Sequence, residues 1–389
     1  MLLQREALEA GNPLATYAAM LDLEDRYRRS KPLAGVYDEV RFNFEEFLGF
    51  PMAGVRAMSL PAFRADRAKD EAIPDGFVPE AAVDVVERAA RKTRVVIWAE
   101  EHHLPQTRSL FEPLLRRLWN QGYRYLAAES FSEQVMESNF EYPNYRSGYY
   151  IQDPVFASAI RTAKQLGYKL IAYDTRERGP EGDNSFRDRT QAAHIKARVL
   201  DRDADAKVFV IAGRLHASEM AAADGWTPMA AALKQMTGID PFTIYAPTMS
   251  QRLTREEEHP WYRAADSGGF LLQPTIFVEK ATGRTLGFDP CDAYVFWPRF
   301  EVKDGRPDWM MKTLGRKPIT IPDALRAGSG RRLVQAFVAG EPSSAIPADQ
   351  LLLERPDAPG LLMLPAGKYR LRAVDERTTE LGSASLQVP

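Results

Sequence analysis

Ionisable residues follow four short apolar runs, each of which predicts a buried strand. In chain order these are 94–99 followed by Glu100, Glu101, His102 and His103, 123–128 followed by Glu129, 168–173 followed by Asp174, and 207–212 followed by Gly213, Arg214, Leu215 and His216. The carboxyl ends of parallel strands meet at one edge of a sheet, and open α/β sheets bind their ligands at that edge. We therefore predict that these side chains share one cleft.

Carboxylates and imidazoles together support two kinds of chemistry. An imidazole oriented by a carboxylate can take a proton from water, while a second imidazole protonates a leaving group. The same residue types can also hold a divalent metal that activates water. The G-x-S-x-G motif that presents a nucleophilic serine is absent from the sequence.

We assign roles to these residues as follows. The predicted catalytic residues are Glu100, His102, His103, Glu129 and His216, and the predicted substrate-binding residues are Glu101, Asp174, Arg187 and Arg214. If a metal is bound, its predicted ligands are His102, His103, Glu129 and His216. Taken alone, Glu101 or Asp174 is better explained as a helix cap or an arginine partner. Tandem histidines on a strand cannot point the same way, so at most one of His102 and His103 touches substrate.

Two further segments could line the cleft. Arg176, Arg178, Arg187 and Arg189 follow the third strand and could bind a carboxylate or phosphate. Except for Arg187, surface ion pairs explain them equally well. The segment 140–150 is rich in aromatic residues, which suits either a wall for a planar ligand or packing against the N-terminal region.

The remaining histidines and the one cysteine carry weaker signals. His194 falls inside a predicted helix and is interpreted as structural, and His259 follows three glutamates in a segment that predicts a solvated loop. Cys291 is interpreted as a small packed residue, because nothing nearby in the sequence marks a base.

Composition excludes several classes of protein. The 389 residues include 51 Lys and Arg against 53 Asp and Glu, a net charge of -2 that gives no reason to expect a nucleic-acid partner. One cysteine allows neither an internal disulfide nor a thiolate metal cage. No apolar stretch of about 18 residues predicts a membrane span, and the N-terminus lacks the apolar core of a signal peptide. We expect a cytoplasmic protein with a small-molecule substrate, although a mature secreted form would have the same sequence features. The oligomeric state is left open.

Alternating strands and helices predict how these residues are positioned. Helices are expected at 14–28, 79–91, 106–121, 154–166, 185–200 and 228–236, and strands at the four runs above and at 242–246. This order is typical of a parallel β-sheet flanked by helices. After residue 265 short strand-like runs separated by Gly, Pro and Asp end in a hairpin of the kind that closes a small sandwich. We predict a helical N-terminal region (1–80), an α/β domain (81–265), a mixed extension (266–330) and a β-rich, sandwich-like region (331–389). The stretch 61–79 is expected to be a linker or an ordered excursion.

Four short motifs resemble the superfamily of erythromycin esterase-like proteins and ChaN-like haem-binding lipoproteins. They are Trp98-Ala99-Glu100-Glu101-His102-His103, Gly122 to Glu129, Arg187-Asp188 and Gly213-Arg214-Leu215-His216, within residues 81–250. Ala99 stands where that superfamily has Gly. Glu100-x-His102 fits one branch and Glu100-x-x-His103 the other.

The resemblance implies an α/β fold whose functional residues are Glu100, the histidine pair, Glu129, Arg187 and His216. The esterase branch implies ester hydrolysis by activated water without a covalent serine. The ChaN-like branch implies haem binding, and more distant relatives imply a metal-dependent peptidase. We therefore expect a hydrolase-like enzyme that needs no cofactor, with a haem or planar-ligand binder and a divalent-metal hydrolase as alternatives.

Overall fold

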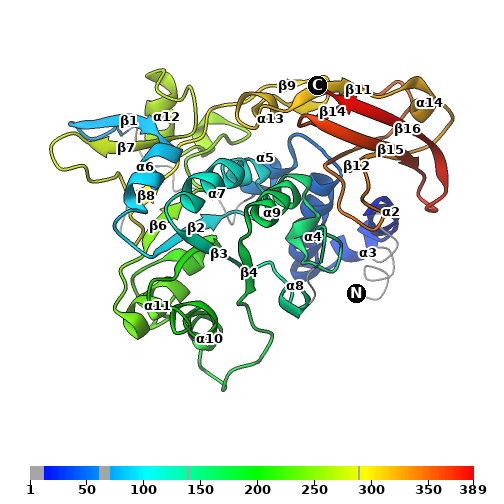
Figure 1. The fold of residues 1–389 in the computed structure, drawn as a ribbon. Coiled ribbons are helices and arrows are strands. Elements are labelled where there is room, and N and C mark those ends of the chain that lie inside the picture. The colour runs from blue at the N-terminus through cyan, green and yellow to red at the C-terminus, as the bar shows by residue number, and fades with distance from the viewer. Residues whose placement is uncertain (1–12, 61–70, 138–139, 288–289) are drawn as a thin grey trace.

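A six-stranded parallel sheet, with the strand order β4-β3-β5-β2-β6-β8, forms the centre of the molecule (Figure 1). The structure is a computed structural model that describes residues 13–60, 71–137, 140–287 and 290–389. The strands are β2 (Val95–Glu100), β3 (Tyr123–Ala128), β4 (Lys169–Ala172), β5 (Lys207–Gly213), β6 (Phe242–Tyr245) and β8 (Ala293–Tyr294). The predicted α/β fold is confirmed, and each end of the five predicted strands lies within one residue of its expected position.

Helices cover both faces of this sheet. One face packs against α6 (Ala82–Ala89), α7 (Phe111–Trp119) and α9 (Pro154–Leu166), and the other against α10 (Phe186–Ile195), η4 (Lys196–Leu200) and α11 (Met229–Thr237). The alternation within β2 shows why the strand is apolar throughout: Val96 and Trp98 join the first core, and Ile97 joins the second.

The first two predicted helices of the α/β domain were partly wrong. Residues 77–81 form strand β1 (Phe77–Ala81), which pairs antiparallel with β7 (Thr275–Glu279). A distant pairing thus overrides the helical pattern at its beginning. Within 106–121, a 3₁₀ turn, η2 (Pro105–Arg108), precedes α7. The hydroxyls of Thr107 and Ser109 donate to backbone carbonyls at 2.8 and 2.7 Å, which competes with a continuous α-helix.

The N-terminal region is helical and packs against the β-rich region. Its helices are α2 (Pro13–Asp22), α3 (Glu24–Arg28), α4 (Lys31–Phe47) and α5 (Ala53–Met58). Leu14, Phe44 and Phe47 share an apolar cluster with Leu333 and Leu352. Figure 1 shows the helices α2 and α3 beside the strands of the C-terminal region.

The β-rich region (331–389) contains a four-stranded antiparallel sheet in the order β13-β12-β15-β16. Its strands are β12 (Arg332–Val338), β13 (Asp349–Leu353), β15 (Gly367–Val374) and β16 (Glu380–Val388). A further strand of the region, β14 (Leu361–Leu364), pairs with β11 (Lys317–Thr320), which precedes residue 331. Side chains from both sheets and from α14 (Asp323–Arg326) share one core, which is the sandwich-like packing that the sequence predicts. The predicted closing hairpin is β15 and β16.

Short elements complete the described chain. They are α8 (Gln134–Glu137), η3 (Tyr150–Gln152), η5 (Arg214–Ala217), η6 (Arg255–Glu257), α12 (Pro260–Ser267), β9 (Val302–Lys303), β10 (Arg306–Pro307) and α13 (Trp309–Lys312). The predicted division at residues 80, 265 and 330 stays a prediction, and most of the predicted linker, residues 61–70, lies outside the described residues. No helix in the described ranges is both long enough and apolar enough to cross a bilayer.

Candidate functional site

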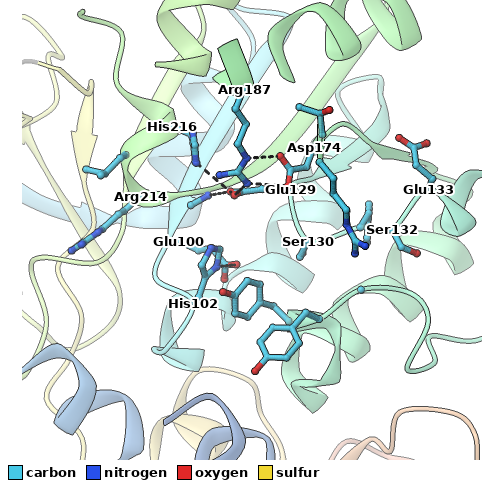
Figure 2. A pocket seen from close by; sticks show the side chains of 18 of the residues that line it. Glu100, His102, Glu129, Ser130, Ser132, Glu133, Asp174, Arg187, Arg214 and His216 are labelled. Atoms are coloured by element: carbon cyan, nitrogen blue, oxygen red, sulfur yellow. Dashed lines mark hydrogen bonds and ion pairs between the residues drawn. The ribbon is translucent and has the colours of Figure 1, made fainter. Parts of the chain in front are cut away.

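A cleft of about 1770 Å³ lies at the carboxyl ends of the central strands. All nine predicted site residues line it: Glu100, Glu101, His102, His103, Glu129, Asp174, Arg187, Arg214 and His216. Figure 2 shows Glu129 between Arg187 and His216, with Glu100 and His102 close by. The residues predicted from the ends of the strands therefore line one common cleft, and their chemical roles stay predictions.

His102 forms a pair with Glu100, the last residue of β2. The His102 Nδ1 donates to Glu100 Oε1 at 3.0 Å, which places its Nε2 on the opposite side of the ring. The other Glu100 oxygen accepts from Arg108 Nε. Arg108 also donates to Asp153 Oδ2 at 2.8 Å and to the His102 carbonyl at 2.9 Å. The ring of His102 is thus oriented by a carboxylate that is itself fixed.

The charges of this pair are set by burial and by the partners of each group. Burial alone would raise the pKa of Glu100, but Arg108 and His102 outweigh it and lower that pKa to about 2. Burial opposes a charge on His102 too, yet the hydrogen bond to Glu100 and the surrounding carboxylates raise its pKa above the usual value. Glu100 is therefore ionised, and His102 becomes a neutral base only when the pH exceeds its raised pKa.

Local chain geometry explains how Arg108 reaches Glu100. A turn after β2 closes where the Leu104 amide donates to the Glu101 carbonyl at 3.0 Å, and η2 then carries Arg108 back over the strand end. Asp153 is the N-cap of α9, and its side chain accepts from the Val155 amide at 2.9 Å. Pro154 is the first residue of that helix, and Gly167, in the left-handed conformation, ends it. One carboxylate thus caps a helix and holds the arginine.

His103 has a different environment from His102. Its Nδ1 donates to Asn43 Oδ1 on α4 at 2.8 Å, and the side chain is buried. Burial, together with the charges of His102 and Arg108, lowers its pKa to about 3. A neutral His103 therefore ties the loop after β2 to the N-terminal helices, and the Glu100-x-His102 register is the one that forms a pair in this cleft.

Glu129 is a hub for several donors. Its Oε1 accepts from Arg187 at 2.8 Å and lies 3.6 Å from His216 Nε2. Its Oε2 accepts from the Gly213 amide at 2.5 Å. Arg187 is also held by both oxygens of Asp174, at 2.9 Å each. Both oxygens of Glu129 are therefore occupied, which favours a role in orienting neighbours.

His216 forms a second histidine–carboxylate pair. Its Nδ1 donates to Asp188 Oδ1 at 2.6 Å. Asp188 also accepts from the Trp226 indole at 3.0 Å and from the Met229 amide at 2.8 Å. Burial lowers the pKa of His216, but Asp188 and Glu129 outweigh that effect and raise it. The Nε2 of this ring faces Glu129, and the imidazole is protonated more readily than that of a free histidine.

Gly213 leaves space in which His102 lies close to Glu129. Register pairing places it beside Glu100 across β2 and β5. A β-carbon built on Gly213 would lie 3.0 Å from Glu129 Oε2 and 3.2 Å from His102 Nε2. Both atoms therefore face the same small space, and a side chain at 213 would enter it.

The other predicted residues lie at the rim of this centre. Arg214 Nε stands 3.7 Å from Glu101 Oε2, and burial raises the pKa of Glu101. Asp174 holds Arg187 and Gln191, which fits its interpretation as an arginine partner. Arg189 forms an ion pair with Asp183 at the surface, which agrees with the surface ion pairs offered as the alternative to ligand binding.

The aromatic segment forms one wall of the cleft. Tyr145, Tyr149 and Tyr150 line it. The Tyr150 ring stacks on His102 with centroids 3.9 Å apart and planes 13° apart. Tyr149 in turn meets Phe47 of α4 edge-on. The segment therefore lines the cleft on one side and packs against the N-terminal region on the other.

His194, His259 and Cys291 lie outside the two histidine–carboxylate pairs, although His194 also lines the cleft. His194 Nδ1 donates to the Tyr173 carbonyl at 3.0 Å. The interpretation of His259 as a solvated loop residue was wrong, because its ring is partly buried and accepts from the Trp261 amide at 3.2 Å to cap α12. Cys291 is buried, and burial raises its pKa to about 12, which suits a packed thiol.

The sequence analysis gave no role to four residues that orient the predicted ones: Asn43, Arg108, Asp153 and Asp188. Asp153 precedes a proline at a helix start, and Asp188 lies in the first turn of a helix, so each carried a capping signal. Arg108 and Asn43 carried none, because the first contacts Glu100 only through the turn and the second lies 60 residues from His103.

The four predicted metal ligands are not arranged as one metal site. In the described residues no group of three or more His, Cys, Asp and Glu side chains is arranged to hold a metal ion. His103 bonds Asn43, and both oxygens of Glu129 already accept hydrogen bonds. These residues do not fit a four-ligand metal site, and we derive no step through a metal.

Comparisons with known proteins identify no family. No protein-family model matches the chain, and no curated protein matches it. Among solved structures, the type III effector HopBA1 is 15% identical with a TM-score of 0.30, over 48% of this chain and 96% of that one. A structure of bacterial protein toxins is 11% identical with a TM-score of 0.33, over 55% of this chain and 46% of that one. Similarities of this size support no conclusion about fold or function here.

Proposed function

We propose that this protein is a hydrolase that uses the His102–Glu100 pair to activate water against an ester or a related bond. The observation that carries the proposal is the fixed orientation of His102, with Nδ1 held by an ionised carboxylate and Nε2 beside Gly213 and Glu129. A carboxylate on Nδ1 selects the tautomer whose Nε2 has a free electron pair. That is the requirement for a general base.

In this proposal the proton movements balance across the two histidine pairs. His102 Nε2 takes a proton from water as the water oxygen bonds the carbonyl carbon. When the C–O bond breaks, protonated His216 gives its Nε2 proton to the leaving alkoxide. Arg187, with His216, supplies positive charge for the oxyanion. The products are an acid and an alcohol, and both histidines return to their starting states by exchange with solvent.

Glu129 fits the role of an orienting residue in this scheme. It holds Arg187 and faces His216, so its carboxylate keeps two positive groups at one side of the cleft. The similarity of the motifs to the erythromycin esterase-like branch supports the same reaction class.

A panel of p-nitrophenyl acetate, p-nitrophenyl octanoate and γ-butyrolactone, assayed with EDTA present, tests the proposal. We expect turnover that His102→Asn lowers by about 10²–10⁴-fold, the usual contribution of a general base. His259→Asn is the matched control, because asparagine also caps helices and His259 does not line the cleft. Absence of turnover on every ester, or full activity in His102→Asn, would reject the proposal.

Haem or planar-ligand binding is the second candidate. His102 Nε2 faces a cleft with an aromatic wall, and such a nitrogen can act as an axial ligand. A Soret band on haem titration that disappears in a His102→Ala, His103→Ala double variant would favour this role over hydrolysis.

A further inference from the structure

The aromatic segment 143–150 lies between the cleft and the β-rich region. At its end, Tyr150 stacks on His102. At its beginning, the Pro143 carbonyl accepts from the Ile346 amide at 2.8 Å, and Asn144 forms an antiparallel bridge with Ala345. One short segment therefore connects the ring of the proposed base to a distant part of the chain.

A buried pair of glutamines anchors the middle of this segment. Gln335 on β12 is hydrogen-bonded to the Tyr145 side chain, and its Nε2 donates to Gln350 Oε1 at 2.9 Å. Gln350 on β13 donates to the Phe47 carbonyl at 2.6 Å. Both glutamines are almost completely buried, so their hydrogen bonds have no competition from water.

The glutamine pair also contacts segment 143–150 indirectly, through Phe47 of α4. Phe47 meets the Tyr149 ring edge-on, with centroids 5.7 Å apart, and Tyr149 meets Tyr150 in the same way at 5.0 Å. Gln335 thus contacts the segment directly, and Gln350 supports it through α4. Both paths end at the ring that stacks on His102.

A second contact fixes the loop that bridges to Asn144. Arg161 on α9 donates to both oxygens of Glu341, at 2.8 and 2.5 Å, and to the Ile346 carbonyl. A two-point arginine–carboxylate pair of this kind fixes orientation as well as distance. The loop before β13 is therefore attached to the α/β domain beside the segment.

We propose that the β-rich region is a positioning element for the candidate active site, acting through Gln335, Gln350 and segment 143–150 on Tyr150. The effect on catalysis rests on the hydrolase function proposed above. The torsion that rotates an imidazole about its bond is broad, so one hydrogen bond to Glu100 leaves the ring free to tilt. The Tyr150 face restricts that tilt and keeps Nε2 beside Gly213. Tyr150 is a positioning residue in this scheme.

The test uses the full chain with ¹³C-labelled histidine ε1 positions, which yields one signal for each of the five histidines. The His102 signal is the one missing in His102→Asn. A stacked ring shields the proton beneath it, so Tyr150→Leu should move this signal downfield, whereas Tyr150→Phe keeps a ring and should not. Gln335→Met and Glu341→Gln should move it in the same direction by less. Glu376→Gln is the matched control, since it breaks only an exposed pair with Arg331 in the same region.

Kinetics on a cleaved ester provide the second readout. A misplaced base can cost about 10²-fold, so Tyr150→Leu should lower kcat by about that factor while Tyr150→Phe retains most of it. KM should change less than kcat, because a positioning residue acts on the reacting geometry.

The two proposals fail in different ways. The positioning role is rejected if Tyr150→Leu does not move the His102 signal. It is also rejected if neither Gln335→Met nor Glu341→Gln moves that signal. Both conclusions hold even when esters are hydrolysed. If all signals move as expected but no ester is cleaved, the hydrolase function fails and the positioning role stands. If Gln335→Met does not fold, Glu341→Gln alone decides, because its side chain lies at the edge of the interface.

Discussion

The two histidine–carboxylate pairs of the cleft differ in the groups that hold their carboxylates. Glu100 ends a central strand and is fixed by the buried Arg108, an ionic partner. Asp188 lies on a helix and is fixed by a backbone amide and an indole N–H, which are neutral donors. The same pairing of side chains can therefore be supported by charge or by neutral hydrogen bonds, and the two should respond differently to mutation and pH.

Removal of one charged group from each network should show the largest difference between the pairs. Arg108→Met leaves Glu100 and Asp153 buried without their cation, which should lower the free energy of unfolding by about 3–5 kcal/mol. Asp188→Asn replaces a carboxylate that accepts from His216 and from two neutral donors, and should cost about 1–3 kcal/mol. Urea unfolding of both variants measures this. Equal losses would show that the ionic network does not distinguish the pairs.

Independent titration is the next expected difference. Each carboxylate raises the pKa of its own histidine, so Glu100→Gln should lower the pKa of His102 and Asp188→Asn that of His216. Histidine NMR titrations measure both values in each variant. A crossed effect, in which Glu100→Gln moves His216 as far as His102, would contradict separate pairs.

The same shifts have a consequence for stability. A histidine whose pKa is higher in the folded state stabilises the fold fully below its unfolded value near 6.5, and that contribution disappears as pH rises through the folded value. Wild-type protein should therefore lose this part of its stability as pH rises from about 6.5 through the raised folded pKa values of His102 and His216, and each variant should lose less. Urea midpoints measured across the pH range check the sign.

The two pairs also differ in how far sequence predicted them. Glu100 ends β2, His102 follows it and His216 follows β5, and such strand ends are recognised by short apolar runs that the structure confirms. Asp188 was within reach, because it directly follows Arg187 at a helix start. Arg108 and Asn43 were not, because their contacts depend on a turn and on the packing of α4, and no period in the sequence encodes either.

The fold shows the same division. Five of the six strands of the parallel sheet were predicted, since strands buried on both faces are apolar throughout. The sixth, the two-residue β8, comes from the predicted extension at 266–330 and was not assigned to this sheet. The start of α6 was missed because residues 77–81 pair with β7, almost 200 residues later. Contacts of that range decide local structure without leaving a local pattern, and the wall at 143–150 depends on them too.

The smallest expected effect concerns the neutral support of Asp188. Trp226→Phe keeps an aromatic ring near His216 but removes the indole donor to Asp188 Oδ2. A carboxylate that loses a donor becomes a stronger acceptor for its remaining partner, so the pKa of His216 should rise slightly while that of His102 stays unchanged. The free energy of unfolding should fall by about 1 kcal/mol, the usual net value of one hydrogen bond. Histidine NMR and urea unfolding measure these effects, and a fall in the pKa of His216 would show that the indole contributes through the ring contact and not through Asp188.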